Sequence, residues 1–89
     1  MAKLEREEIT IKGVTYVCRE LDFDTMMGIM EAGDTEGVPL SKRLLAAAVE
    51  ADGVPLEEGA IGSMGFGTTS KLINRVNALN GIGDDAGKS

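Results

Sequence analysis

Two spacings of hydrophobic and polar residues run along this chain, and each predicts a different element. From Glu7 to Arg19, β-branched and aromatic side chains alternate with polar ones on both sides of Gly13, which predicts a β-hairpin. The turn is either a two-residue Lys12-Gly13 turn or a longer turn with a bulge at Gly13. With the two-residue turn, one face of the hairpin carries Ile9, Ile11, Val14, Tyr16 and Cys18.

A hairpin of two strands is marginally stable in water, so it must pack on helices or pair with another copy. Its open edges make β-pairing between subunits one expectation. The alternative is an edge that its own charged side chains protect from pairing.

Residues 21–32 have the spacing of a first amphipathic helix. Asp22 is the expected N-cap, and Asp24 lies in the first turn, where a carboxylate favours the positive end of the helix dipole. The apolar stripe of this helix consists of Phe23, Met26, Met27 and Met30. Gly28 either weakens the helix or lets another backbone come close. We expect a loop at 33–37.

Two further helices follow the same spacing. The helix at 41–51 has an inner face of small and aliphatic residues and ends at Asp52-Gly53. The helix at 68–81 begins with Thr68 or Thr69 as its cap and closes at Gly81, which can adopt the left-handed conformation. The inner faces consist of Leu44, Leu45, Ala48 and Ala51, and of Leu72, Ile73, Val76 and Leu79.

The segments between and beyond these helices have weaker signals. Residues 56–63 are weakly helical, and glycines interrupt the run from Gly59 to Gly67. Residues 1–6 are expected to be frayed, and 82–89 form a polar, Gly-rich tail. The sequence therefore predicts one small α+β domain at 7–81, with an N-terminal β-hairpin followed by three to four helices.

Composition narrows the classes of partner. The chain has 89 residues, of which 43% are hydrophobic and three are aromatic, so the core must be small, aliphatic and rich in methionine. The net charge of −6 disfavours nucleic acid, whose phosphates require a basic face, and anionic membranes for the same reason. We therefore expect neither nucleic acid nor a membrane among the partners.

Candidate catalytic residues are scarce. The chain has no histidine, so Cys18, the single cysteine, has no Cys–His partner for nucleophilic catalysis. One cysteine cannot form an intramolecular disulfide, and the polar N-terminus lacks the pattern of a signal peptide, so a cytoplasmic location is expected. Helix capping accounts for Asp22 and Asp24 better than metal binding does. We expect no catalytic residue, no cofactor and no metal.

The methionines are the strongest candidates for a binding surface. Their unbranched, polarizable side chains adapt to irregular apolar partners, and filling of the core is the alternative. A deformable surface of this kind would suit an apolar helical client. The candidate partner-binding residues are Met26, Met27, Met30, Met64 and Phe66.

In their order, these segments resemble the tail assembly chaperones of long-tailed bacteriophages and related prophages. The similarity covers 9–81 and rests on ITIKGVTYVCRELDF followed by DTMMGIM, on LLAAAVEADGVPL, and on the closing helix LINRVNALNG. The Gly-rich run at 59–67 departs from the pattern, since a firmer helix would be expected there.

The resemblance implies a non-enzymatic function in the host cytoplasm. Such proteins keep the long helical tape-measure protein in solution until the tail-tube protein polymerises around it, self-associate into homo-oligomers, and are absent from the mature virion. One alternative is a small structural virion component, such as a neck or head–tail joining protein. A second alternative is a small enzyme that acts through carboxylates.

Overall fold

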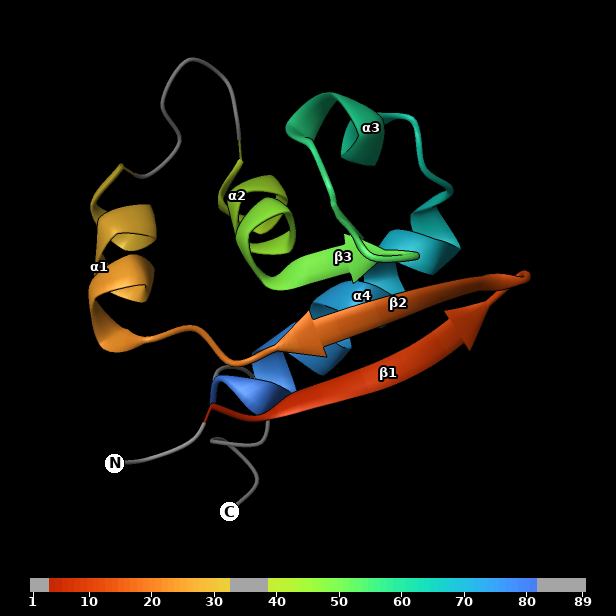
Figure 1. Ribbon diagram of the computed structural model, residues 1–89. Helices are drawn as coiled ribbons and strands as arrows, with labels where there is room; N and C mark the ends of the chain where they lie inside the picture. The colour runs from red at the N-terminus through yellow and green to blue at the C-terminus, as the bar shows by residue number, and fades with distance from the viewer. Residues whose placement is uncertain (1–3, 33–38, 82–89) are drawn as a thin grey trace.

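An antiparallel sheet of four strands packs against helices in the computed structural model, which describes residues 4–32 and 39–81 (Figure 1). Within these ranges the strand order is β1-β2-β3-β4, and four helices accompany the sheet. The predicted α+β class, with a hairpin first and helices after it, is confirmed. The expected loop at 33–37 and the expected tail at 82–89 lie outside the described residues, as do residues 1–3.

The first hairpin has the register expected for the two-residue turn. Strand β1 (Arg6–Ile11) pairs with β2 (Val14–Arg19) so that Ile9 lies opposite Tyr16. Lys12 and Gly13 have φ of 51° and 83°, so both central residues of the turn are left-handed, as a two-residue type I′ turn requires. The longer, bulged turn is therefore wrong. Arg6 was expected in the frayed end but is the first residue of β1.

A second hairpin was not predicted. Helix α2 (Leu40–Ala48) ends three residues before the expected boundary, and Val49 is already extended, with φ −125° and ψ 136°. The chain continues as β3 (Val49–Ala51) and returns as β4 (Val54–Pro55). Asp52 and Gly53 between them have φ of 51° and 88°, which is again a left-handed pair.

Pairing with β2 explains why the helix stops at Ala48. Val49 lies opposite Cys18, and the backbone N–H of Asp52 donates to the Thr15 carbonyl at 2.8 Å. Extended backbone lets Val49 become fully buried against the hairpin. Ala51 was predicted on the inner face of the helix and lies in β3 instead.

The three other helices lie where the sequence predicts helices, and one of them starts earlier than expected. Helix α1 (Phe23–Ala32) is capped as predicted, since the Thr25 N–H donates to Asp22 Oδ1 at 2.8 Å. The weakly helical segment forms α3 (Glu58–Gly62). Helix α4 (Phe66–Leu79) begins two residues early.

The start of α4 is not capped by a threonine, contrary to the prediction. Gly65 occupies the cap position, and Thr68 is buried. The Thr69 hydroxyl instead donates back to the carbonyls of Gly65 and Phe66, at 3.3 and 3.0 Å. At the other end Gly81 has φ 71°, so the predicted left-handed residue is confirmed.

The core lies between one face of the sheet and helices α2 and α4, with α4 behind β2 and β3 in Figure 1. The predicted apolar face of the first hairpin packs in it, and Cys18 is fully buried. The cluster of buried residues consists of Ile11, Tyr16, Cys18, Leu45, Ala48, Val49, Ile61, Leu72 and Val76. Helix α2 is central because it packs against each of the other three helices.

Candidate functional site

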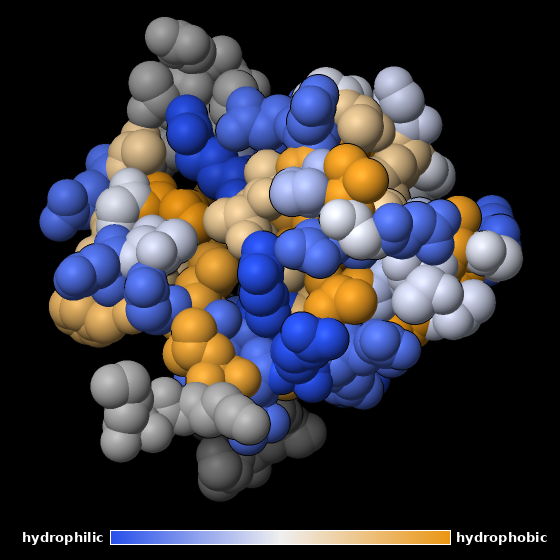
Figure 2. Space-filling model, in the orientation of Figure 1, coloured by the Kyte–Doolittle hydropathy of each residue, from blue (hydrophilic) through white to orange (hydrophobic). Residues whose placement is uncertain are grey.

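An apolar hollow of about 320 Å³ separates α1 from α2 and α4. We call it the α1 groove. The described residues that line it carry no charge, and five of these seven are apolar: Met26, Met30, Leu40, Ser41, Leu44, Ile73 and Asn77. Figure 2 shows apolar residues in the hollow between α1 and α2, with hydrophilic residues around it.

A second hollow, of about 260 Å³, lies between α2, α3 and the start of α4. We call it the α3 pocket. It is lined by Pro39, Ser41, Lys42, Leu45, Ile61, Gly62, Met64, Phe66, Thr69 and Ile73. Ser41 and Ile73 line both hollows, so the two adjoin across α2 and α4 and form one largely apolar surface.

Four of the five predicted partner-binding residues lie on this surface. Met26 and Met30 line the α1 groove, and Met64 and Phe66 line the α3 pocket. These two pairs are more than thirty residues apart in the sequence, and the fold brings them to neighbouring hollows. Met27 lines neither hollow, because the next residue on a helix points about 100° away.

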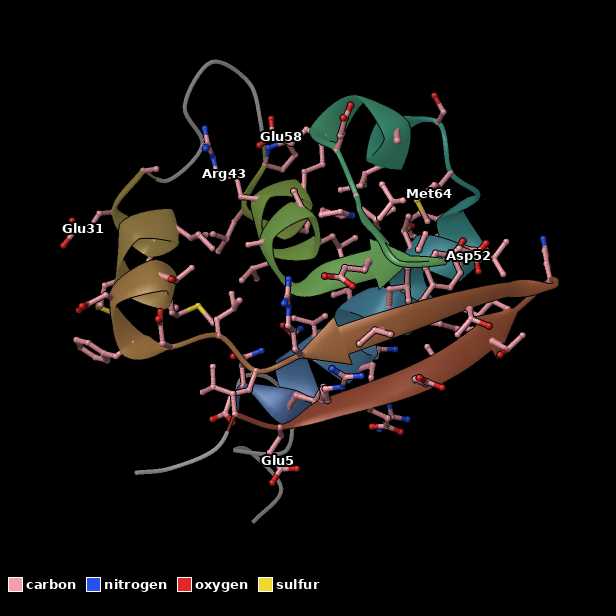
Figure 3. All side chains as sticks on the ribbon, in the orientation of Figure 1. Glu5, Glu31, Arg43, Asp52, Glu58 and Met64 are labelled. Atoms are coloured by element: carbon pink, nitrogen blue, oxygen red, sulfur yellow. The ribbon has the colours of Figure 1, made fainter. Side chains whose placement is uncertain are left out.

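Exposure separates the residues that a partner can reach from those that support the fold. Phe66 is 86% exposed and Met30 is 44% exposed, whereas Met26 is 9% exposed and holds α1 in place. Phe23, on α1, is 73% exposed but lines neither hollow. Of the predicted residues in the two hollows, Met30 and Phe66 are therefore accessible to a partner, and half-buried Met64 lies between α3 and α4 (Figure 3).

Sequence reasoning missed several lining residues. Leu44 and Ile73 were assigned to the core because the spacing that marks a buried helix face also marks the wall of a groove. Leu40 precedes the predicted start of its helix, yet it is the first residue of α2 and is 39% exposed. A large apolar residue on the first turn, followed by Leu44 four residues later, is the signal that could have identified this wall.

Charged groups stay at the margin of the surface. Among the residues that the structure describes, Lys42 is the one charged side chain that lines either hollow, and its Nζ lies 3.2 Å from the point where a Cβ on Gly62 would be. Glu31 points away from α2 in Figure 3. An apolar side chain could therefore enter the α1 groove without desolvating a charged lining residue.

Asn80 fixes the segment that precedes α1 to the end of α4. Its Oδ1 accepts a hydrogen bond from the Leu21 N–H at 2.8 Å, while its Nδ2 donates to the Val76 carbonyl at 2.8 Å and to the Arg19 carbonyl at 3.5 Å. One side chain thus joins the last turn of α4 to the segment between β2 and α1. We call this set of bonds the Asn80 clasp.

The titratable groups indicate structural roles. Burial raises the pKa of the Cys18 thiol, with a smaller effect from the nearby Glu7 carboxylate, so the thiol is protonated at neutral pH and is a poor nucleophile. Hydrogen bonds from Thr25 hold the pKa of Asp22 below its usual value, as expected of a capping carboxylate. Within 4–32 and 39–81, no group of three or more potential metal-ligating side chains comes together.

In the part of the chain that the structure describes, no helix has the length and apolarity needed to cross a lipid bilayer. Comparison with models of protein families, with curated proteins and with solved structures finds no match to this chain.

Proposed function

We propose that this protein is a phage tail assembly chaperone that binds the tape-measure protein through the joined α1 groove and α3 pocket and keeps it soluble. The observation that carries the proposal is the meeting of Met30, Met64 and Phe66 on one accessible, largely uncharged surface. The sequence resemblance supplies the identity of the client. The proposed action is non-enzymatic and consists of covering apolar surface until the tail-tube protein takes its place.

The chemistry of the surface suits an amphipathic helix. Helix-in-groove recognition places side chains at i, i+3, i+4 and i+7 of the bound helix into an apolar groove. The adjoining hollows have about 320 and 260 Å³, so they offer space for several client side chains. Methionine and phenylalanine walls can fit different sequences along a long client, because methionine adopts many shapes at little cost.

The surface also sets a limit on affinity. Burying about four large apolar side chains is worth roughly 6–12 kcal/mol at 1.5–3 kcal/mol each. Association costs roughly 4–15 kcal/mol, so one molecule at one site binds weakly. We therefore propose that several copies act along one tape-measure chain, each of them able to leave when the tail-tube protein arrives.

Co-expression tests the proposal directly. The full chain is produced together with the tape-measure protein encoded in the same phage or prophage genome, and the soluble fraction of the client is measured. We expect the client to be soluble with the chaperone and to aggregate without it. A client that is equally soluble in both conditions would exclude the proposed function.

Two phenylalanines provide a matched pair of variants. Phe66 and Phe23 are both strongly exposed, and each is the first residue of its helix, but Phe66 alone of the two lines a described hollow. Removing one phenylalanine that the bound client would bury should weaken client binding about ten-fold to a hundred-fold. We expect Phe66→Ser to release the client and Phe23→Ser to retain it, with equal far-UV circular dichroism.

The same variants also test the location of the site. Equal client retention by the two variants would place the binding surface elsewhere on the molecule.

Mass spectrometry of purified virions adds a separate criterion, since a chaperone is absent from them. Stoichiometric presence of this chain in mature particles would instead indicate a structural neck or head–tail joining protein.

A further inference from the structure

Helix α1 is weakly attached to the rest of the fold. Met26 is its one buried side chain, whereas Phe23 and Met30 are exposed. Neither Met26 nor Leu44, which lines the α1 groove with it, belongs to the cluster of buried residues that joins the sheet to α2 and α4. Few buried apolar contacts are typical of segments that open locally at low free-energy cost.

The helix is also intrinsically weak. Gly28 lies in its middle, and apart from its chain neighbours and the helix's own backbone no described atom lies within 4 Å of the position a Cβ would take there, so no close packing explains the glycine. Glycine inside a helix has high backbone entropy in the unfolded chain, which disfavours the helix. The last turn contains Glu31 and no basic residue, so a carboxylate lies near the negative end of the helix dipole.

The segment before α1, in contrast, is held firmly. The Asn80 clasp fixes the backbone at Leu21. Next to it, the Glu20 N–H donates to the Glu5 carbonyl at 2.8 Å, and the Glu5 N–H donates to Glu20 Oε1 at 3.0 Å. Any movement of α1 must therefore begin after Leu21, close to the capping residue Asp22.

We propose that α1 is a hinged element that opens about Leu21–Asp22 while the sheet, α2 and α4 stay folded. Opening breaks the contact of Met26 with the groove and uncovers Leu44 and Ile73, so that the α1 groove becomes continuous with solvent along its length. This opening is a property of the chain by itself. Its use in admitting a client helix rests on the proposed function.

A single introduced tryptophan can follow α1 separately from the core. The chain has no tryptophan, so Met30→Trp places one reporter at the groove wall of α1. Cys18, the single cysteine, is fully buried, and its alkylation by iodoacetamide reports opening of the core. We expect the tryptophan emission to shift at a lower urea concentration than that at which Cys18 becomes reactive. Coincident transitions would overturn the proposal.

Two further substitutions, made in the Met30→Trp variant, test whether the few buried contacts and the low helix propensity of α1 cause it to open. Met26→Ala should lower the midpoint of the tryptophan transition, and Gly28→Ala should raise it, while the Cys18 transition stays within error of its starting value. Equal shifts of both transitions would show that α1 unfolds with the core and would refute the hinge. A chain that opens as described but leaves its client insoluble would refute the chaperone function and leave this inference standing.

Discussion

The Asn80 clasp offers the sharpest test of how the groove is held together. Asn80→Ala removes the acceptor for the Leu21 N–H and the donor to the carbonyls of Val76 and Arg19. The Leu21 amide is part-buried in its bond to Asn80, so water replaces the lost partner incompletely. The substitution should therefore destabilise the whole domain and loosen the start of α1 in particular.

The expected loss of stability follows from the hydrogen bonds that Asn80→Ala removes. The two hydrogen bonds of 2.8 Å contribute about 0.5–1.5 kcal/mol each, and the unsatisfied Leu21 N–H adds a desolvation cost, which together give about 2 kcal/mol. A domain of 89 residues has roughly 4–13 kcal/mol of stability in total. A loss of about 2 kcal/mol should lower its Tm by about 8–16 °C.

The assay is urea unfolding followed by far-UV circular dichroism, with Asn74→Ala as the matched control. Asn74 is exposed on the same helix and has no side-chain hydrogen bond to the described residues. Alanine there should change stability by less than about 0.7 kcal/mol, in the stabilising direction. If Asn80→Ala lies within about 0.5 kcal/mol of Asn74→Ala, the reasoning about the clasp is wrong.

Three further predictions follow from burial and capping. Leu72→Ala, at a fully buried position, should cost about 2–5 kcal/mol in urea unfolding, and a cost under 1 kcal/mol would show that this part of the core is not well packed. Cys18 should resist iodoacetamide in the native protein at neutral pH, because burial and Glu7 raise its pKa; modification detected by mass spectrometry without denaturant would contradict this. Because bonds from Thr25 lower the pKa of Asp22 in the folded state, its carboxylate stabilises α1 above about pH 4, and this stabilisation is lost as pH falls below that value. Asp22→Asn keeps a capping side chain without the titration, so circular dichroism should show a smaller acid-induced loss of helix than in the wild type; equal losses would assign the acid effect to other groups.

The first hairpin could be predicted from its alternating side chains, whereas its turn, and with it the register, stayed open between two alternatives. Alternating side chains specify which face is buried, and the left-handed Lys12-Gly13 pair matches the twist of a two-residue turn. Lysine is not a preferred residue at that turn position. The burial pattern of the flanking strands therefore decides the register more strongly than the turn residues do.

The second hairpin was missed because two local signals conflict. The run from Leu44 to Val49 continues an apolar helical pattern, and Asp52-Gly53 can end a helix as well as join two strands. The decisive contact is with β2, more than thirty residues earlier, where Val49 pairs with Cys18. Residues 49–51 taken by themselves do not indicate that a partner strand lies beside them, so tertiary pairing overrides helix propensity.

The candidate site could be predicted by residue type but not by place. Their apolar, adaptable side chains made Met30, Met64 and Phe66 candidates for partner binding, and the fold brings these residues to adjoining hollows. The sequence pattern did not separate Met26, a buried anchor, from Met30, because both lie on one apolar stripe. The role of Asn80 could not be predicted from the sequence, because its side chain bonds to the backbone of Arg19 and Leu21, which are distant along the chain.

The direct junction between α2 and β3 has a consequence for length variation in this protein. Ala48 ends the helix and Val49 begins the strand, with no connecting residue between them. An insertion of one residue at this junction would turn Val49 from the interior to the opposite side of the sheet, since strand side chains alternate. Homologues should therefore show neither insertions nor deletions here, and a gap-free alignment across this boundary would be its evolutionary signature.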